Sequence, residues 1–292
     1  MRILLTSFTL LILFQNIVYA QVKKDSIDTY KLRNIILVES ALYAGGMTGL
    51  GLLWYKDSES QSFQFFNDNK QWLQMDKVGH VYTAYQLTDI NYQLLKNTGM
   101  SSQKAMLYSS LSSTAMMLPI EIFDGFSTSY GASWGDAVAN TIGAFLPYQQ
   151  FLFNQNYIYP KFSFSPSPYA KIRPNTLGNN IVEQLIKDYN GQTYWLSTDF
   201  NIFSKNNKFP DWLQFSVGYS GNQMVYGSPK DNAGNGYNAN RQWLLSMDFN
   251  LNKIEVEQKW LKIMLNVINK VKIPFPTVEW NGKKVVLHPL YY

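Results

Sequence analysis

Long apolar segments with helical spacing fill the first half of the chain. One runs over 34–55 and is interrupted by a single glutamate, and others are predicted over 76–96, from Ser101 or Ser102 to 123, and from Ser133 to about 153. Ser133 and Asp136 are spaced as a capping box, and Asp76 is placed to cap the second of these helices. Four apolar helices with short connections predict a bundle-like region.

The pattern changes near residue 157, where helical spacing ends. Prolines indicate a linker over 157–192 that contains a short amphipathic helix near 180–189. An aromatic-rich region follows over 193–292. The expected fold class is α+β: a four-helix bundle-like domain over 21–156, then a small antiparallel sheet with an amphipathic helix.

Strands are predicted where apolar and polar residues alternate. The clearest cases lie within 213–220 and 242–251, with a weaker one over 193–203 and a long loop at 221–240. Asn281-Gly282 favours a type I′ hairpin. About four or five strands are visible, fewer than a closed membrane barrel needs, so we expect a small sheet packed on helices or against a membrane.

Apolar residues over 254–271 have the spacing of an amphipathic helix, and lysines accompany them. Such a helix either lies on a membrane surface or packs into the core, and the sequence leaves both interpretations open. Aromatic content of 16% with only 15% charged residues also suggests contact with a membrane, since soluble domains carry about 25% charged residues.

Residues 1–20 have the features of a signal peptide: Met1-Arg2, an apolar stretch and a small residue at Ala20. The net charge of +5 is spread along the chain, which does not indicate nucleic-acid binding. The sequence has no cysteine, which excludes disulfides, thiolate metal sites, cysteine nucleophiles and a lipidated cysteine within it.

Three polar clusters interrupt the apolar helices, at 76–80, 121–125 and 136–140. Within each cluster the polar residues are three or four positions apart and share a helix face. Isolated ionisable groups in apolar surroundings are costly, so the three faces are expected to converge. The predicted polar network consists of Asp76, Lys77, His80, Glu121, Asp124, Asp136 and Asn140. Gly45, Gly49 and Gly143 are predicted to allow close helix packing.

The motifs in these clusters resemble a known family. They are Asp76-Lys77-x-x-His80, Glu121-x-x-Asp124-Gly125 and Ser133-x-x-Asp136-x-x-x-Asn140-x-x-Gly143. They are similar to the YfiM-like domain-of-unknown-function family of predicted periplasmic or envelope proteins, and more distantly to the VanZ-like membrane family. The resemblance covers roughly 34–153, and 157–195 looks like the longer members from Bacteroidota-type bacteria. Neither family supplies an established reaction.

The clusters have two chemical interpretations. His80, Glu121, Asp124 and Asp136 are candidate catalytic groups, and His80, Glu121 and Asp136 are candidate ligands for a divalent metal. With a single histidine and no recognisable nucleophile motif, the clusters equally suit an interhelix hydrogen-bond network. The other histidine, His288, is expected to be structural.

We therefore expect an exported, membrane-associated envelope protein in the periplasm or outer membrane of a Gram-negative bacterium, with a structural or accessory role. The alternatives are a metal-dependent or acid/base enzyme using the His/carboxylate site, and a small outer-membrane β-protein. No cofactor is predicted, although a divalent metal remains an open alternative. The expected partners are a membrane surface or envelope proteins, and the sequence indicates no oligomeric state.

Overall fold

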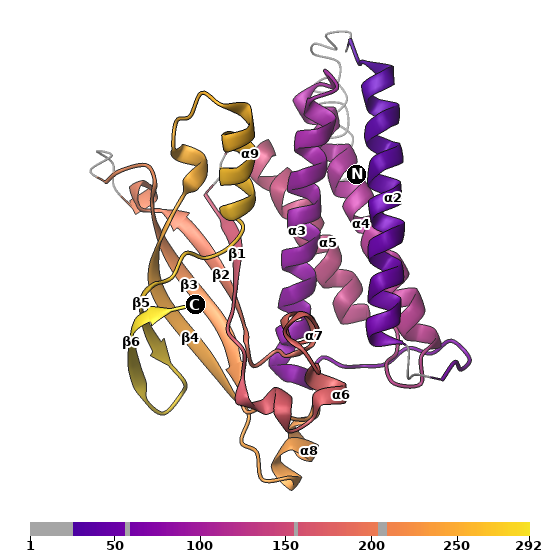
Figure 1. Ribbon diagram of the computed structural model, residues 1–292, viewed down its shortest axis with the longest axis vertical. Helices are drawn as coiled ribbons and strands as arrows, with labels where there is room; N and C mark the ends of the chain where they lie inside the picture. The colour runs from indigo at the N-terminus through magenta and orange to yellow at the C-terminus, as the bar shows by residue number, and fades with distance from the viewer. Residues whose placement is uncertain (1–25, 56–58, 155–156, 204–208) are drawn as a thin grey trace, which may run out of the picture.

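The computed structural model describes residues 26–55, 59–154, 157–203 and 209–292, so the predicted signal peptide lies outside the described residues. Figure 1 shows long helices on one side of the molecule and a twisted sheet on the other. The α+β prediction is confirmed, with the helices preceding the sheet in the sequence.

The helical part contains four long helices: α2 (Thr29–Trp54), α3 (Met75–Lys96), α4 (Ser102–Phe126) and α5 (Trp134–Leu152). Of these, α3, α4 and α5 pack against one another. Helix α2 runs alongside them (Figure 1), and Tyr43 donates a hydrogen bond to Met116 O of α4 at 2.7 Å. No residue of α2 is buried.

Close packing of α3 on α5 depends on Gly143, because a Cβ at this position would lie 2.2 Å from Val81 O. Nearby, Thr88 donates to Ala144 O at 3.0 Å. By contrast, a Cβ at Gly45 or Gly49 would have no heavy atom within 4 Å. These two glycines therefore make no close helix contact in the described structure, because their part of α2 is exposed.

The sheet has six antiparallel strands paired in sequence order. They are β1 (Tyr159–Phe164), β2 (Gln192–Asp199), β3 (Leu213–Asn222), β4 (Asn240–Phe249), β5 (Phe275–Trp280) and β6 (Val285–Tyr291). The hairpin between β5 and β6 occurs where it was predicted, but its turn is not type I′. Such a turn needs positive φ at both central residues, whereas only Gly282 has it, at 86°.

Short helices occupy the segments between strands: α6 (Pro174–Leu177), α7 (Ile181–Lys187), α8 (Pro229–Gly234) and α9 (Lys259–Ile268). The proline-rich stretch contains β1 and α6 as well as the predicted short helix, α7. The predicted long loop contains α8, where Asn232 is 1% exposed and accepts hydrogen bonds from Val225 N and Tyr226 N at 3.0 Å.

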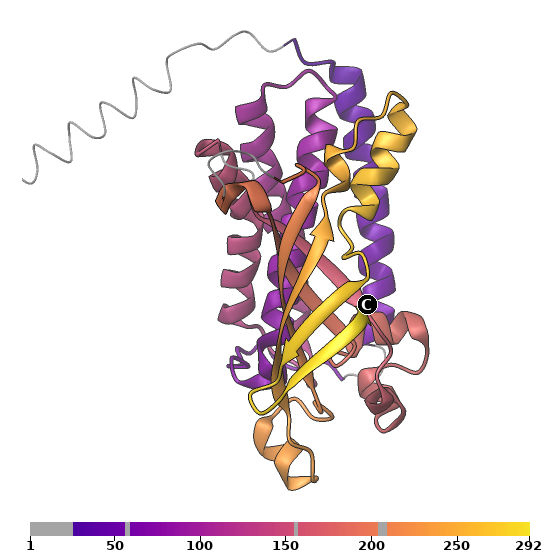
Figure 2. The ribbon, with the colours of Figure 1, turned by 90° about the vertical axis from the view of Figure 1, so that its left-hand side faces the viewer.

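The sheet contacts the bundle mainly where β1 and β2 meet α3. The rings of Tyr82, Phe162 and Tyr194 lie 5.3 to 5.8 Å apart, centroid to centroid. Figure 2, turned by 90°, shows the strands crossing in front of the helices. The two parts therefore form one structure with an aromatic contact between them.

Candidate functional site

The three polar clusters meet at one end of the helical part, where α3 and α5 begin and α4 ends. The chain enters α3 through Trp72, Leu73 and Gln74, which have φ values of 46°, 52° and 64°. This left-handed segment makes Gln74 the N-cap, so the prediction that Asp76 caps the helix is wrong. Asp76 instead accepts a hydrogen bond from the Tyr189 hydroxyl at 2.7 Å.

Lys77 lies at the centre of the convergence. Its Nζ is 2.8 Å from Asp68 Oδ1 and 2.9 Å from Asp136 Oδ1. Ser133 donates to Asp68 Oδ1 at 2.7 Å and accepts from Asp136 N at 3.2 Å, so the predicted capping residue of α5 is confirmed. One ammonium group therefore holds a loop, α3 and α5 together.

His80 contacts the other two helices. Its Nδ1 is 2.9 Å from Asn140 Oδ1, and Asn140 Nδ2 donates to Glu121 Oε1 at 3.3 Å. Glu121 also accepts from Ser133 N at 3.2 Å. On the other side of the ring, Nε2 lies 3.6 Å from Asp76 Oδ1. The side chain of His80 is only 12% exposed, so the ring lies inside this network.

The closeness of these groups shifts their pKa values. Burial alone would lower the pKa of His80, but the carboxylates of Asp76, Asp136 and Glu121 raise it above its ordinary value. Burial, together with nearby Asp76, raises the pKa of Asp136 to about 7. Burial alone would raise the pKa of Asp68, but the hydrogen bonds from Lys77 and Ser133, together with the charge of Lys77, lower it. Asp68 is thus the ionised partner of Lys77.

Asp124 belongs to the same end of α4 but binds a different partner. Its Oδ1 accepts a hydrogen bond from the Tyr55 hydroxyl at 2.6 Å, just beyond the end of α2. Burial raises the pKa of Asp124 to about 7, against the effect of the Tyr55 hydrogen bond. Asp124 therefore ties the segment after α2 to α4.

One subset of these side chains has the spacing of metal ligands. Ligand atoms of Asp76, His80 and Asp136 lie within 4.8 Å of one another. Two of the three ligands predicted from the sequence, His80 and Asp136, belong to this set. The third member is Asp76, whereas the sequence suggested Glu121. Lys77 already occupies one side of Asp136, so an added cation would meet a positive charge.

Two members of the cluster were not predicted from the sequence. Asp68 lies in a polar loop with no motif around it, and Tyr189 comes from the segment between α7 and β2. Both reach the cluster through contacts between residues far apart in the chain: Asp68 with Lys77, and Tyr189 with Asp76. Tyr189 follows Asp188 in the sequence, and no local motif marks it as a member of the cluster.

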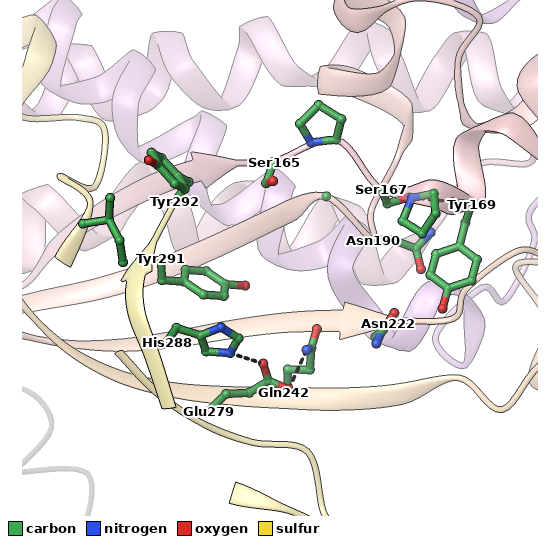
Figure 3. Close-up of a pocket in the computed structure, with 14 residues that line it drawn as sticks. Ser165, Ser167, Tyr169, Asn190, Asn222, Gln242, Glu279, His288, Tyr291 and Tyr292 are labelled. Atoms are coloured by element: carbon green, nitrogen blue, oxygen red, sulfur yellow. Dashed lines mark hydrogen bonds and ion pairs between the residues drawn. The ribbon is translucent and has the colours of Figure 1, made fainter. Parts of the chain in front are cut away.

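His288 lies outside this cluster, on β6. Figure 3 shows it beside Glu279, with Nε2 and Oε2 2.8 Å apart, while Gln242 donates to the other oxygen of Glu279 at 2.7 Å. These side chains line a cavity of about 340 Å³ between β6 and the segment that follows β1. Ser165, Asn190 and Tyr291 line the same cavity.

Part of the helical region matches a known protein family. Residues 63–152 match the model of a family described as predicted periplasmic lipoprotein (DUF2279), which confirms the resemblance to the YfiM-like family over this segment. The matched segment contains every cluster residue of the helical part, from Asp68 to Asn140, and leaves out α2 and Tyr189. No curated protein and no solved structure matches the chain.

The raised pKa of Asp124 predicts how stability changes with pH. Between about pH 4 and pH 7 the folded protein keeps a proton on Asp124 that the unfolded chain has lost. The stability from this group is therefore complete below about pH 4 and is lost as the pH rises through 7. Asp124→Asn cannot ionise and still accepts from Tyr55. We expect the fall in melting temperature between pH 5 and pH 8 to be smaller in this variant than in the wild type.

Thermal unfolding of the purified protein in detergent checks this prediction. The matched control is Asp231→Asn, which changes an aspartate in the first turn of α8, away from the cluster. Equal pH dependence in the wild type and in Asp124→Asn would show that Asp124 is ionised in the folded protein at pH 5.

Proposed function

We propose that this protein is an exported component of the cell envelope that is held in a membrane and has a structural or accessory role. Helix α2 carries the proposal, because it is long and apolar enough to cross a membrane and none of its residues is buried. Its 26 residues extend about 39 Å, more than the roughly 30 Å of a bilayer core. Leu37 and Leu42 are 60% and 72% exposed.

Helix α9 supports the same proposal. Trp260, Ile263, Met264, Val267 and Ile268 recur at helical spacing, and each is more than 40% exposed. On the opposite side, Asn266 accepts from Gln93 of α3 at 3.3 Å. An amphipathic helix with an apolar side that faces outward suits contact with lipid better than a core.

The family match supports a location in the envelope. The matching family is described as periplasmic, and an apolar helix near the N-terminus is compatible with export. In this proposal the protein faces the periplasm and is bound to the inner or outer membrane of a Gram-negative bacterium. The sequence holds no cysteine for a lipid, so α2 provides the membrane attachment.

The role that we assign to the polar cluster is structural. Each charged group has a partner from another element: Lys77 has Asp68 and Asp136, and Asp76 has Tyr189. Such a network holds three helix ends and the segment before β2 in one arrangement. Removing one member leaves its partners buried without a counterpart, which costs about 3 kcal/mol or more in unfolding free energy.

A divalent-metal site at Asp76, His80 and Asp136 is the second candidate, favoured by the spacing of their ligand atoms. The structural proposal predicts that His80→Ala and Asp136→Asn lower the melting temperature. The first removes the buried contact of His80 with Asn140, and the second removes the carboxylate that pairs with Lys77. It also predicts that the purified wild type carries no equimolar divalent ion. Metal analysis and thermal unfolding of the same samples decide between the two. An equimolar ion that is lost from a normally stable His80→Ala protein would select the metal site.

Membrane attachment is tested by extraction of membranes from cells that express the full chain. We expect the protein to stay in the pellet after alkaline carbonate and after high salt, and to be released by detergent. A known periplasmic protein from the same cells is the control for complete washing. Release by carbonate or by salt would reject attachment through α2.

A further inference from the structure

A continuous row of aliphatic side chains crosses the outward face of the sheet. The row contains one residue from each of β2 to β6, and these residues are paired in register: Leu196, Val217, Leu245, Val278 and Leu287. Leu245 is 48% exposed and Leu287 is 74% exposed. Side chains paired across adjacent strands touch their neighbours, so these residues form a patch rather than scattered exposed positions.

Aromatic side chains border this row on both sides. Toward one end of the strands, Tyr219, Trp243 and Trp280 are paired in register, and the rings of Tyr219 and Trp243 are 4.9 Å apart. Toward the other end, Trp212 stacks on Phe249 at 5.4 Å. From Trp243 to Phe249, strand β4 rises about 20 Å.

The inward face of the same strands is polar. The row next to the aliphatic one contains Ser197, Ser216, Ser246, Thr277 and His288. Further along, Lys161 of β1 pairs with Asp248 of β4 at 2.8 Å, and both side chains have no exposed surface. Trp195 and Leu244 are the large apolar side chains buried on this face, whereas most of the other apolar side chains of these strands are exposed.

This polarity is the reverse of that of a sheet in water, which turns its apolar face to the core. An outward apolar band between two aromatic rows, over a polar interior, is the arrangement of strands that span a membrane. Strands β3 and β4 have ten residues each, within the 9 to 11 that a spanning strand needs.

One edge of the sheet is covered, which suits a membrane because exposed backbone groups would be costly there. At β1, Phe162 N donates to Lys270 O at 3.1 Å and Lys272 N donates to Phe162 O at 2.9 Å. At the other edge, the end of β6 borders the polar cavity of Figure 3, where water can bind its backbone.

We propose that the outward face of β2 to β6 lies against the acyl chains of a lipid bilayer, with the two aromatic rows toward its two headgroup levels. This inference rests on the proposed membrane attachment, but its residues are independent of α2. No outward position between the aromatic rows is charged in the described strands. That favours hydrocarbon over a protein partner, whose contact surface would end in a polar rim.

The polar cluster then lies near one headgroup level. The hydroxyl of Tyr219, in an aromatic row, donates to Leu73 O just before α3. Tyr194, its partner in register, has its hydroxyl 2.7 Å from where a Cβ on Gly79 would be. The buried charges of the cluster therefore stay at the edge of the hydrocarbon, where their burial costs least.

Nitroxide labels on single cysteines test the proposal, since the chain has no cysteine of its own. The full chain is reconstituted in phosphatidylethanolamine/phosphatidylglycerol nanodiscs, and collisions with oxygen and with a water-soluble nickel chelate are measured. We expect Leu245→Cys and Leu287→Cys to collide several-fold more with oxygen than with nickel, relative to Lys283→Cys in the hairpin turn. The inward neighbour Ser246→Cys should meet neither reagent.

A label on α2, Leu42→Cys, separates this proposal from membrane attachment itself. Oxygen contact at Leu42 with nickel contact at Leu245 would overturn the sheet proposal and leave the attachment standing. Nickel contact at both would overturn both. A label at Leu245 that meets neither reagent would mean that protein, in the form of a second copy or a partner, covers the face, which also overturns the proposal.

Discussion

Buried polar groups must find partners within the protein, and this requirement shapes both halves of the molecule. The sheet encloses Lys161 and Asp248 as a pair with no exposed surface, and the helical part encloses Lys77 between Asp68 and Asp136. Between α3 and α4, Asn91 donates a hydrogen bond to Ser112 at 2.9 Å. In the core of a water-soluble protein, larger apolar side chains would occupy such positions. Polar interiors of this kind cost least where their polar groups are hydrogen-bonded, and bonded networks favour one arrangement of the elements.

The apolar side chains that these interiors exclude lie on the outside. On α2, on α9 and on the sheet they form continuous surfaces. Water would make this arrangement unfavourable by about 25 cal/mol for each Å² of exposed apolar surface, whereas hydrocarbon removes that cost. In the proposed membrane, the polar network and the apolar surface are consistent with each other.

The sequence was sufficient to locate most helices and strands. It was insufficient to predict which face of the sheet is buried. Apolar spacing located α3 to α5 almost to the residue, and Ser133 indicated the start of α5. Alternation over β3 and β4 revealed two faces, but a period of two is the same whichever face is buried, so it could not tell inside from outside. Prolines hid β1. Asp68 and Tyr189 join the cluster only through contacts between distant residues, and no local pattern predicts such contacts.

Tryptophan fluorescence in brominated lipid tests most directly whether the outside of the molecule faces lipid. Trp243, Trp260 and Trp280 are 45% to 66% exposed on the apolar surface, whereas Trp195 is 1% exposed inside the sheet. In nanodiscs whose acyl chains carry bromine we expect most of the emission to be quenched, and less so after Trp243→Phe and Trp280→Phe. Equal emission from brominated and ordinary nanodiscs that both retain the protein would contradict the account.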